Sequence, residues 1–134
     1  MKREKLLKTA PETLVSEAAR LMAAKNVGAI MVIEDDRLVG IFTERDVVFR
    51  VVARGLDAQA TRLSEVMTRA PHTVDAERPL GYALRVMQEK GFRHLPVIQD
   101  GRAVGIISSR SAMDPDLEEF VAEANRRKQF EDKR

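Results

Sequence analysis

The chain has 134 residues, with 23 Lys and Arg against 21 Asp and Glu, and it contains no cysteine. This length is typical of one domain, and the lack of cysteine excludes disulfides, thiolate metal sites and cysteine nucleophiles. No apolar run approaches the roughly 20 residues of a membrane helix, and no signal peptide is recognisable, so we expect a cytoplasmic protein that does not span a membrane.

Positive charge gathers near both ends, in residues 1–5 and 126–134, although the formal net charge is only +2. Such terminal runs are usually solvated. The sequence has no groove-reading helix pattern and no set of stacking aromatics beside them. Nucleic acid is therefore not a favoured partner.

The chain repeats itself with an offset of 65 residues. Residues 7–46 and 72–111 are identical at 13 of 40 aligned positions. A repeat of this size predicts two copies of one supersecondary element that bury their faces on each other. Either copy alone would bury too little surface to be stable. We therefore expect one two-lobed body, with a cleft for a ligand between the copies.

Each copy is predicted to contain a helix followed by two strands. In the first copy, apolar residues at helical spacing cover 15–22, Asn26 ends the helix, and strands cover 29–33 and 38–43. In the second copy the helical spacing covers 80–87, with Pro79 in the first turn and Gly91 at the end. Strands at 94–98 and 103–108 flank the hairpin signal Asp100-Gly101.

Further elements surround these units. We expect a helix over 45–54 that Gly55 stops, a linker over 56–62, a helical turn over 63–67 and a short strand over 71–74. A last helix begins at Asp114. The predicted apolar faces of the 45–54 and C-terminal helices exceed what a small body needs, which favours a homodimer. Their members are Val47, Val48, Val51, Val52, Leu117, Phe120 and Val121.

Gly40 and Gly105 occupy the same repeat position, inside the second strand of each copy. A glycine within a strand marks either the close approach of a ligand or another backbone, or a packing glycine or bulge. Its recurrence at the equivalent position favours the functional interpretation.

Thr43 and Asp46 lie where the second strand of copy one meets the following helix. Their spacing fits a capping box, which is a purely structural arrangement. It also fits a ligand site, because a carboxylate can accept two hydrogen bonds from a ribose diol and a helix N-terminus suits a phosphate. The two interpretations are compatible, since a ligand can share or displace a cap.

Two segments of the sequence resemble the CBS domain. One is the repeated ending Gly40-Ile41-Phe42-Thr43 to Asp46, and the other is the second-copy strand His94-Leu95-Pro96-Val97-Ile98. The whole chain is similar to a stand-alone tandem CBS pair, or Bateman module, over about residues 9–113. The resemblance implies an α/β (α+β) fold of two β-α-β-β-α repeats with pseudo-two-fold symmetry. The expected segments are repeat 1 (1–55), the linker (56–62), repeat 2 (63–113) and a C-terminal helix with a charged tail (114–134).

The resemblance also implies a ligand. CBS pairs bind adenosine derivatives such as AMP, ADP, ATP, NAD or S-adenosylmethionine in clefts between the repeats. Asp46 resembles the family's ribose-binding carboxylate, Thr43 its hydroxyl near the phosphate, and Ile41 an apolar wall. A guanidinium such as that of Arg93 pairs well with phosphate. The residues that the second repeat is expected to add are His72, Phe92, Arg93 and His94, although either histidine could instead be an ordinary hydrogen-bonded residue.

The second cleft departs from the family pattern. Ser108 keeps the hydroxyl, Ser111 replaces the carboxylate, and Gly28 stands where copy two has Arg93. Loss of that acceptor would weaken binding by about 1–3 kcal/mol, or roughly 5- to 150-fold. We expect one strong site on Asp46 and a weaker second one around Ser108, Ser111, Gly28 and Arg110. The family's usual first strand is also expected to be reduced or absent in copy one.

The sequence can be interpreted in terms of three functions. The first is a regulatory module that senses an adenine nucleotide and acts on a downstream protein partner not identified by the sequence. The alternative is a structural, dimerising or partner-binding module with vestigial clefts. An enzyme is disfavoured because the chain has only His72 and His94, no cysteine and no glycine-rich phosphate loop after a strand.

Overall fold

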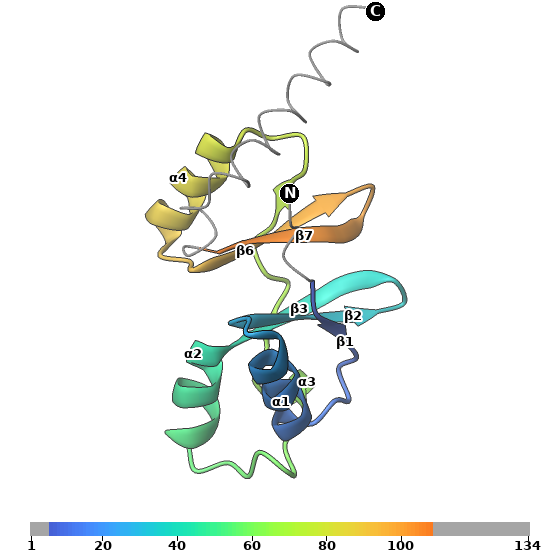
Figure 1. Cartoon of the computed structure of the whole chain (residues 1–134), viewed down its shortest axis with the longest axis vertical. Helices are drawn as coiled ribbons and strands as arrows, with labels where there is room; N and C mark the ends of the chain where they lie inside the picture. The colour runs from blue at the N-terminus through green and yellow to red at the C-terminus, as the bar shows by residue number, and fades with distance from the viewer. Residues whose placement is uncertain (1–5, 109–134) are drawn as a thin grey trace, which may run out of the picture. The chain divides into compact units, whose positions relative to one another are not determined.

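The computed structural model describes residues 6–108, which form two compact units divided between Pro71 and His72. Both units mix helices with a β-sheet, so the expected α/β class is confirmed (Figure 1). The elements of the N-terminal unit are β1 (Lys8–Thr9), α1 (Val15–Lys25), β2 (Ala29–Glu34), β3 (Arg37–Thr43), α2 (Glu44–Asp46), the π-helix η1 (Val47–Val52), α3 (Leu63–Val66) and β4 (Thr68–Arg69). Those of the C-terminal unit are β5 (Val74–Asp75), α4 (Leu80–Lys90), β6 (His94–Gln99) and β7 (Arg102–Ser108).

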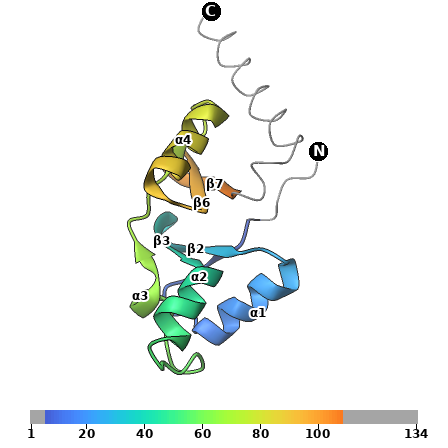
Figure 2. The same ribbon diagram turned by 90° about the vertical axis from the view of Figure 1, so that its left-hand side faces the viewer.

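The sheet of the N-terminal unit has the strand order β1-β2-β3-β4. β1 runs parallel to β2, whereas the β2–β3 and β3–β4 pairs are antiparallel. Helices α1 and α2 lie on the same face of this sheet (Figure 2). The core between the helices and the sheet consists of Val15, Ala18, Met22, Ile30, Val32, Phe42, Val51, Leu63, Val66 and Met67.

The C-terminal unit repeats this plan in its described part. β5 runs parallel to β6, and β6 pairs antiparallel with β7. Residues at helical spacing on α4 bury themselves against the sheet, as the sequence predicts. The buried cluster contains Val74, Ala83, Met87, Leu95 and Ile107.

The predicted helix ends and hairpins are confirmed. Asn26 ends α1 and Gly91 ends α4, both in the left-handed conformation, with φ of 54° and 73°. The hairpin turns are shorter than expected in both units. Asp35-Asp36 and Asp100-Gly101 alone form them, all four residues having positive φ, because such turns match the right-handed twist of the strands. Pro79 immediately precedes α4 instead of lying in its first turn.

The connector, residues 58–70, packs within the N-terminal unit although residue 63 was expected to open the second repeat. The N–H groups of Val15 and Ser16, which begin α1, donate to the carbonyls of Thr61 (2.9 Å) and Ala58 (2.9 Å). These bonds supply the partners that the start of a helix lacks. Leu63 is fully buried, and β4 adds a strand to the edge at β3. The compact units and the sequence repeats therefore have different boundaries.

The helix expected over 45–54 begins at Glu44 and widens from α-helical to π-helical geometry over η1. In the wider turn the Ala53 N–H donates to the Val48 carbonyl (2.8 Å), five residues earlier. Val51 is buried, but the side chains of Val48 and Val52 are exposed. The predicted apolar face is thus only partly covered within this unit.

Two expectations about the chain's ends have different outcomes. The first strand of copy one is present but reduced to the two residues of β1. The helix expected after residue 114 lies outside the described residues. None of the helices within residues 6–108 has the length and apolar character required to span a membrane.

Candidate functional site

Thr43 and Asp46 form a reciprocal capping box at the junction of β3 and α2. The Thr43 N–H donates to Asp46 Oδ2 (2.9 Å), and the Asp46 N–H donates to Thr43 Oγ1 (3.2 Å). The structural interpretation of this pair is therefore confirmed. The same contacts hold a hydroxyl and a carboxylate side by side at the strand end, which is the arrangement that the ligand interpretation needs.

The Asp46 carboxylate is also fixed from its other side. Asp46 is only 8% exposed, and its Oδ1 lies 3.4 Å from Arg50 Nε, one helical turn further on. Oδ2 thus accepts one hydrogen bond, and Oδ1 has an ion-pair partner. An ionised carboxylate offers about four acceptor positions, so roughly two remain for other donors.

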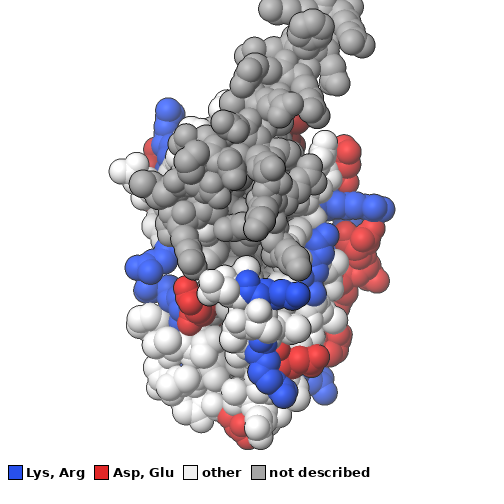
Figure 3. Space-filling view, in the orientation of Figure 1, with Lys and Arg blue, Asp and Glu red and all other residues white. Residues whose placement is uncertain are grey.

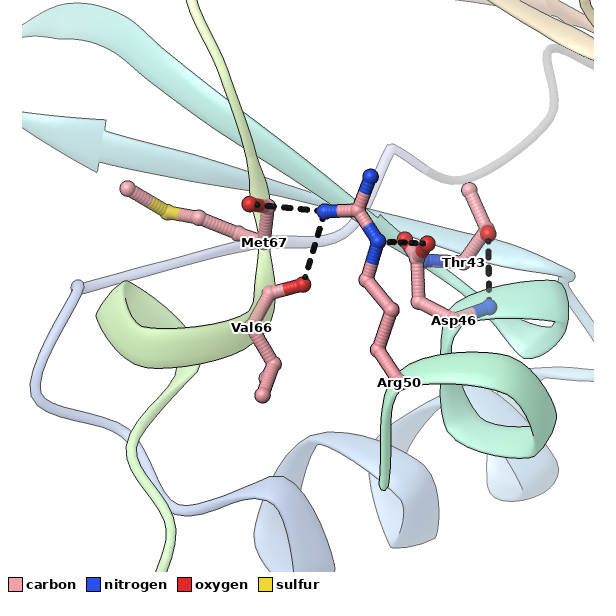
Figure 4. Close-up of polar contacts among 5 residues, drawn as sticks. All are labelled: Thr43, Asp46, Arg50, Val66 and Met67. Carbon is pink, nitrogen blue, oxygen red and sulfur yellow. Dashed lines mark hydrogen bonds and ion pairs between the residues drawn. The ribbon is translucent and has the colours of Figure 1, made fainter. Parts of the chain in front are cut away.

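Arg50 is a residue of this site that our sequence reasoning missed. Its guanidinium faces the Asp46 carboxylate on one side and the carbonyls of Val66 and Met67 on the other (Figure 4). The signal available in the sequence was its position four residues after Asp46, because residues so spaced lie on one helix face. Its contacts with the connector required the tertiary fold.

Gly40 has a close neighbour within its own unit. A Cβ built at Gly40 would lie 3.0 Å from Met67 Cγ and closer still to its sulfur. The neighbour that demands a glycine here is therefore the Met67 side chain. Gly105 differs, since its nearest neighbour is Val97 Cβ at 3.8 Å, an ordinary contact distance. Both glycines lie beside a β-bulge, at Val32/Ile33 and Val97/Ile98 respectively.

The expected ligand residues of the second repeat lie along two of its segments. His72 opens the C-terminal unit, and its ring centroid lies 4.9 Å from that of Phe92, just after α4. Arg93 is exposed in the turn before β6. His94 begins β6 opposite Ser108 at the end of β7, and both are half-buried. Within this unit these residues therefore gather where α4 meets the sheet and at one end of the β6–β7 pair.

The remaining predicted residues lie in different places. Ile41 is buried in β3, where it pairs with Met31. Gly28 precedes β2, and its carbonyl accepts the Glu44 N–H (3.0 Å), which places it beside the start of α2. Arg110 and Ser111, expected in the weaker cleft, lie outside the described residues.

The two units repeat one arrangement of sheet and helix, and the first of them has a hydroxyl and a carboxylate at a strand-to-helix junction. The CBS-domain family model matches residues 1–53 and 63–115. The chain therefore belongs to the CBS-domain family, with two copies of the domain.

Relatives of known sequence differ widely in length. The chain is 38% identical over 98 residues to the CBS domain-containing protein YhcV of Bacillus subtilis, covering 73% of this chain and 69% of YhcV. It is 36% identical over 113 residues to the meiotically up-regulated gene 70 protein of Schizosaccharomyces pombe, covering 76% of this chain. The chain spans only 16% of the length of that fission yeast protein.

Solved structures share the fold. A conserved protein from Pyrococcus horikoshii is 37% identical, with a TM-score of 0.78 and coverage of 84% of this chain and 86% of that one. A CBS domain protein from Pyrobaculum aerophilum, solved in complex with AMP, is 25% identical, with a TM-score of 0.77 and coverage of 92% and 95%. A hexameric CBS-CP12 protein from bloom-forming cyanobacteria is 29% identical, with a TM-score of 0.76 and coverage of 90% and 69%.

Proposed function

We propose that this chain is a regulatory module that binds an adenine nucleotide (AMP, ADP, ATP or NAD) between its two CBS repeats. The observation that carries the proposal is the Asp46 carboxylate, which is buried, fixed by Thr43 and Arg50, and left with acceptor positions to spare. The AMP complex of the Pyrobaculum aerophilum relative supports this ligand class.

The role proposed for Asp46 follows from the chemistry of ribose. Two neighbouring hydroxyls of a ribose both donate well to one carboxylate, and hydrogen bonds to a charged group are stronger than neutral ones. The Thr43 hydroxyl accepts the Asp46 N–H and keeps its own proton to donate, which suits a phosphate oxygen. Both groups are held by the backbone of one turn, so little ordering is needed when a ligand arrives.

We assign the rest of the site to the second repeat. Arg93 is exposed and would pair with a phosphate, while His72, Phe92 and His94 would supply ring and hydrogen-bonding contacts. The buried Ile41 would form an apolar wall. The weaker second site, with Ser111 in place of a carboxylate, is part of the same proposal. These groups suit ligand binding rather than catalysis, because the carboxylate is held by the Thr43 N–H and the Arg50 guanidinium instead of activating a nucleophile.

Calorimetric titration with AMP, ADP, ATP and NAD tests the proposal. Asp46→Ala is expected to weaken the preferred nucleotide by about 5- to 150-fold, because two ribose hydroxyls lose their acceptor. Glu44→Ala is the matched control, since it removes an exposed carboxylate from the same helical turn. If the folded wild type binds none of the four nucleotides, or if Asp46→Ala binds as the wild type does, the proposal is wrong.

A role in assembly is the second candidate, and the surface of η1 favours it. Val48, Phe49 and Val52 are 54%, 56% and 67% exposed. Figure 3 shows a largely uncharged area over this helix. We propose that this face joins two copies of the chain in a homodimer, because burial of apolar side chains is the main force of association. The hexameric CBS-CP12 relative shows that a protein of this fold assembles.

Analytical ultracentrifugation of Val52→Asp tests the assembly proposal. The charge is expected to shift the chain toward monomer, whereas Val104→Asp, at an exposed valine of β7, is expected to leave the mass unchanged. A wild type that sediments as a monomer would contradict the dimer. A dimer that binds no nucleotide would support assembly as the principal function.

A further inference from the structure

Arg50 connects the Asp46 carboxylate to the connector that leads into the second repeat. Its Nε lies 3.4 Å from Asp46 Oδ1, and its Nη1 donates to the carbonyls of Val66 (3.2 Å) and Met67 (3.1 Å). The two carbonyls belong to the end of α3, where a helix has acceptors without partners in the helix itself. One planar group therefore forms an ion pair with the carboxylate and donates hydrogen bonds to the end of α3 (Figure 4).

This geometry depends on a guanidinium. Arginine presents several N–H donors in one rigid plane, so fixing one edge on the main chain also fixes the nitrogen that faces the carboxylate. A lysine ammonium is a single point on a flexible stem and cannot hold both sides with the same orientation. The Val66 and Met67 carbonyls are anchored in turn, because both residues are buried in the core of the N-terminal unit.

We propose that Arg50 is a positioning residue for Asp46, and that it thereby determines the preference for ribose over deoxyribose nucleotides. The inference rests on the proposed function. The hydrogen bond from the Thr43 N–H to Oδ2 and the ion pair of Arg50 with Oδ1 hold the carboxylate from two sides, so its remaining acceptor positions keep one direction. A diol needs that fixed direction, because both of its hydroxyls must be met together. A 2′-deoxyribose makes only one such bond.

The stability of the chain is expected to depend little on this pair. Arg50 is 43% exposed along its side chain, and ion pairs of such exposure contribute little to folding. The main effect of its removal is therefore expected in the choice of ligand. This difference separates positioning from a merely structural role, which would weaken every ligand alike.

The ligand test compares AMP with 2′-deoxy-AMP on wild type, Arg50→Met and Arg50→Lys. We expect the wild type to prefer AMP by about tenfold or more, as one hydrogen bond to a charged group would give. Both variants are expected to lose most of that preference through weaker binding of AMP. Arg54→Met, which removes an exposed arginine one turn further along, is the matched control and is expected to keep it.

A second measurement needs no ligand. The Thr43 N–H donates to the carboxylate that Arg50 holds, so its hydrogen exchange is expected to be several-fold faster in Arg50→Met and unchanged in Arg54→Met. Unchanged exchange in Arg50→Met would overturn the positioning role whether or not the chain binds nucleotides. Equal weakening of AMP and 2′-deoxy-AMP in Arg50→Met would overturn it too. A wild type that binds none of AMP, ADP, ATP and NAD, with faster Thr43 exchange in Arg50→Met, would refute the proposed function and support positioning alone.

Discussion

The two repeats have the same local backbone but fill the space around it differently. Val32 pairs with Gly40, and Val97 pairs with Gly105, each just before a bulge in the hairpin. Around Gly40 the Met67 side chain leaves no room for a Cβ, whereas Gly105 has room for one. The duplication has therefore preserved hairpin geometry, while the packing against each hairpin has diverged.

Polar groups show a second difference between the repeats. The N-terminal repeat ends its hairpin with Thr43 and Asp46, and the aligned positions in the other repeat are Ser108 and Ser111. At another pair of aligned positions the second repeat has the charged residue, because Gly28 of the first repeat aligns with Arg93. Under our proposal, the acceptors for a ribose diol lie on the N-terminal repeat and the cation for a phosphate lies on the other. A ligand carrying both groups would need both repeats, as our proposal requires.

The largest expected loss of stability comes from shortening a buried leucine in either core, and it shows which unit the connector stabilises. Leu63 and Leu95 are both fully buried, one in each core. Leu63→Ala and Leu95→Ala are each expected to lower the free energy of unfolding by about 2–5 kcal/mol, because each leaves a cavity. Hydrogen exchange is expected to rise mainly over residues 6–60 for Leu63→Ala and mainly over 72–108 for Leu95→Ala. A rise confined to 72–108 in Leu63→Ala would show that the connector belongs with the second repeat.

A smaller loss of stability is expected from replacing a glycine by alanine, and it tests whether the packing around Gly40 and Gly105 differs. Gly40→Ala is expected to lower the free energy of unfolding by about 1–3 kcal/mol in urea titrations, because Met67 must move. Gly105→Ala is expected to be neutral or slightly stabilising, since alanine loses less backbone entropy than glycine on folding.

A rescue experiment distinguishes packing from other causes. Adding Met67→Ala to Gly40→Ala is expected to cost less than the sum of the two single changes, because the smaller side chain removes the clash. Strict additivity in this pair, or equal losses at Gly40 and Gly105, would contradict the packing explanation.

Much of the fold could be predicted because local signals and tertiary structure agree. The helix ends at Asn26 and Gly91 and the hairpin at Asp100-Gly101 are encoded by residues that accept positive φ. The connector could not be assigned in the same way. Leu63 opens the expected second repeat, yet its side chain is buried in the core of the N-terminal unit. Nothing in the neighbouring sequence indicates this packing.

The candidate site was predictable only in part, for a related reason. Thr43 and Asp46 interact across three residues of sequence, so their spacing was sufficient to identify the capping box. The partners of Arg50 on the connector lie 16 and 17 residues away, and those contacts exist only after the connector has packed. The π-helical geometry of η1 was likewise not predicted, although the exposure of Val48 and Val52 agrees with an apolar face larger than a small body needs.

The smallest expected effect concerns the junction of β3 and α2, where the repeats differ in chemistry. Thr43→Val keeps the shape of the side chain but removes the acceptor of the Asp46 N–H, and it is expected to cost about 0.5–2 kcal/mol in urea titrations. Thr43→Ser keeps that acceptor and is expected to lose little. Because Asp46 stays tied to Arg50 in both variants, the preference for AMP over 2′-deoxy-AMP should survive a change at Thr43 better than one at Arg50. Equal losses of preference in Thr43→Val and Arg50→Met would mean that the whole capping turn, rather than the guanidinium, orients the carboxylate.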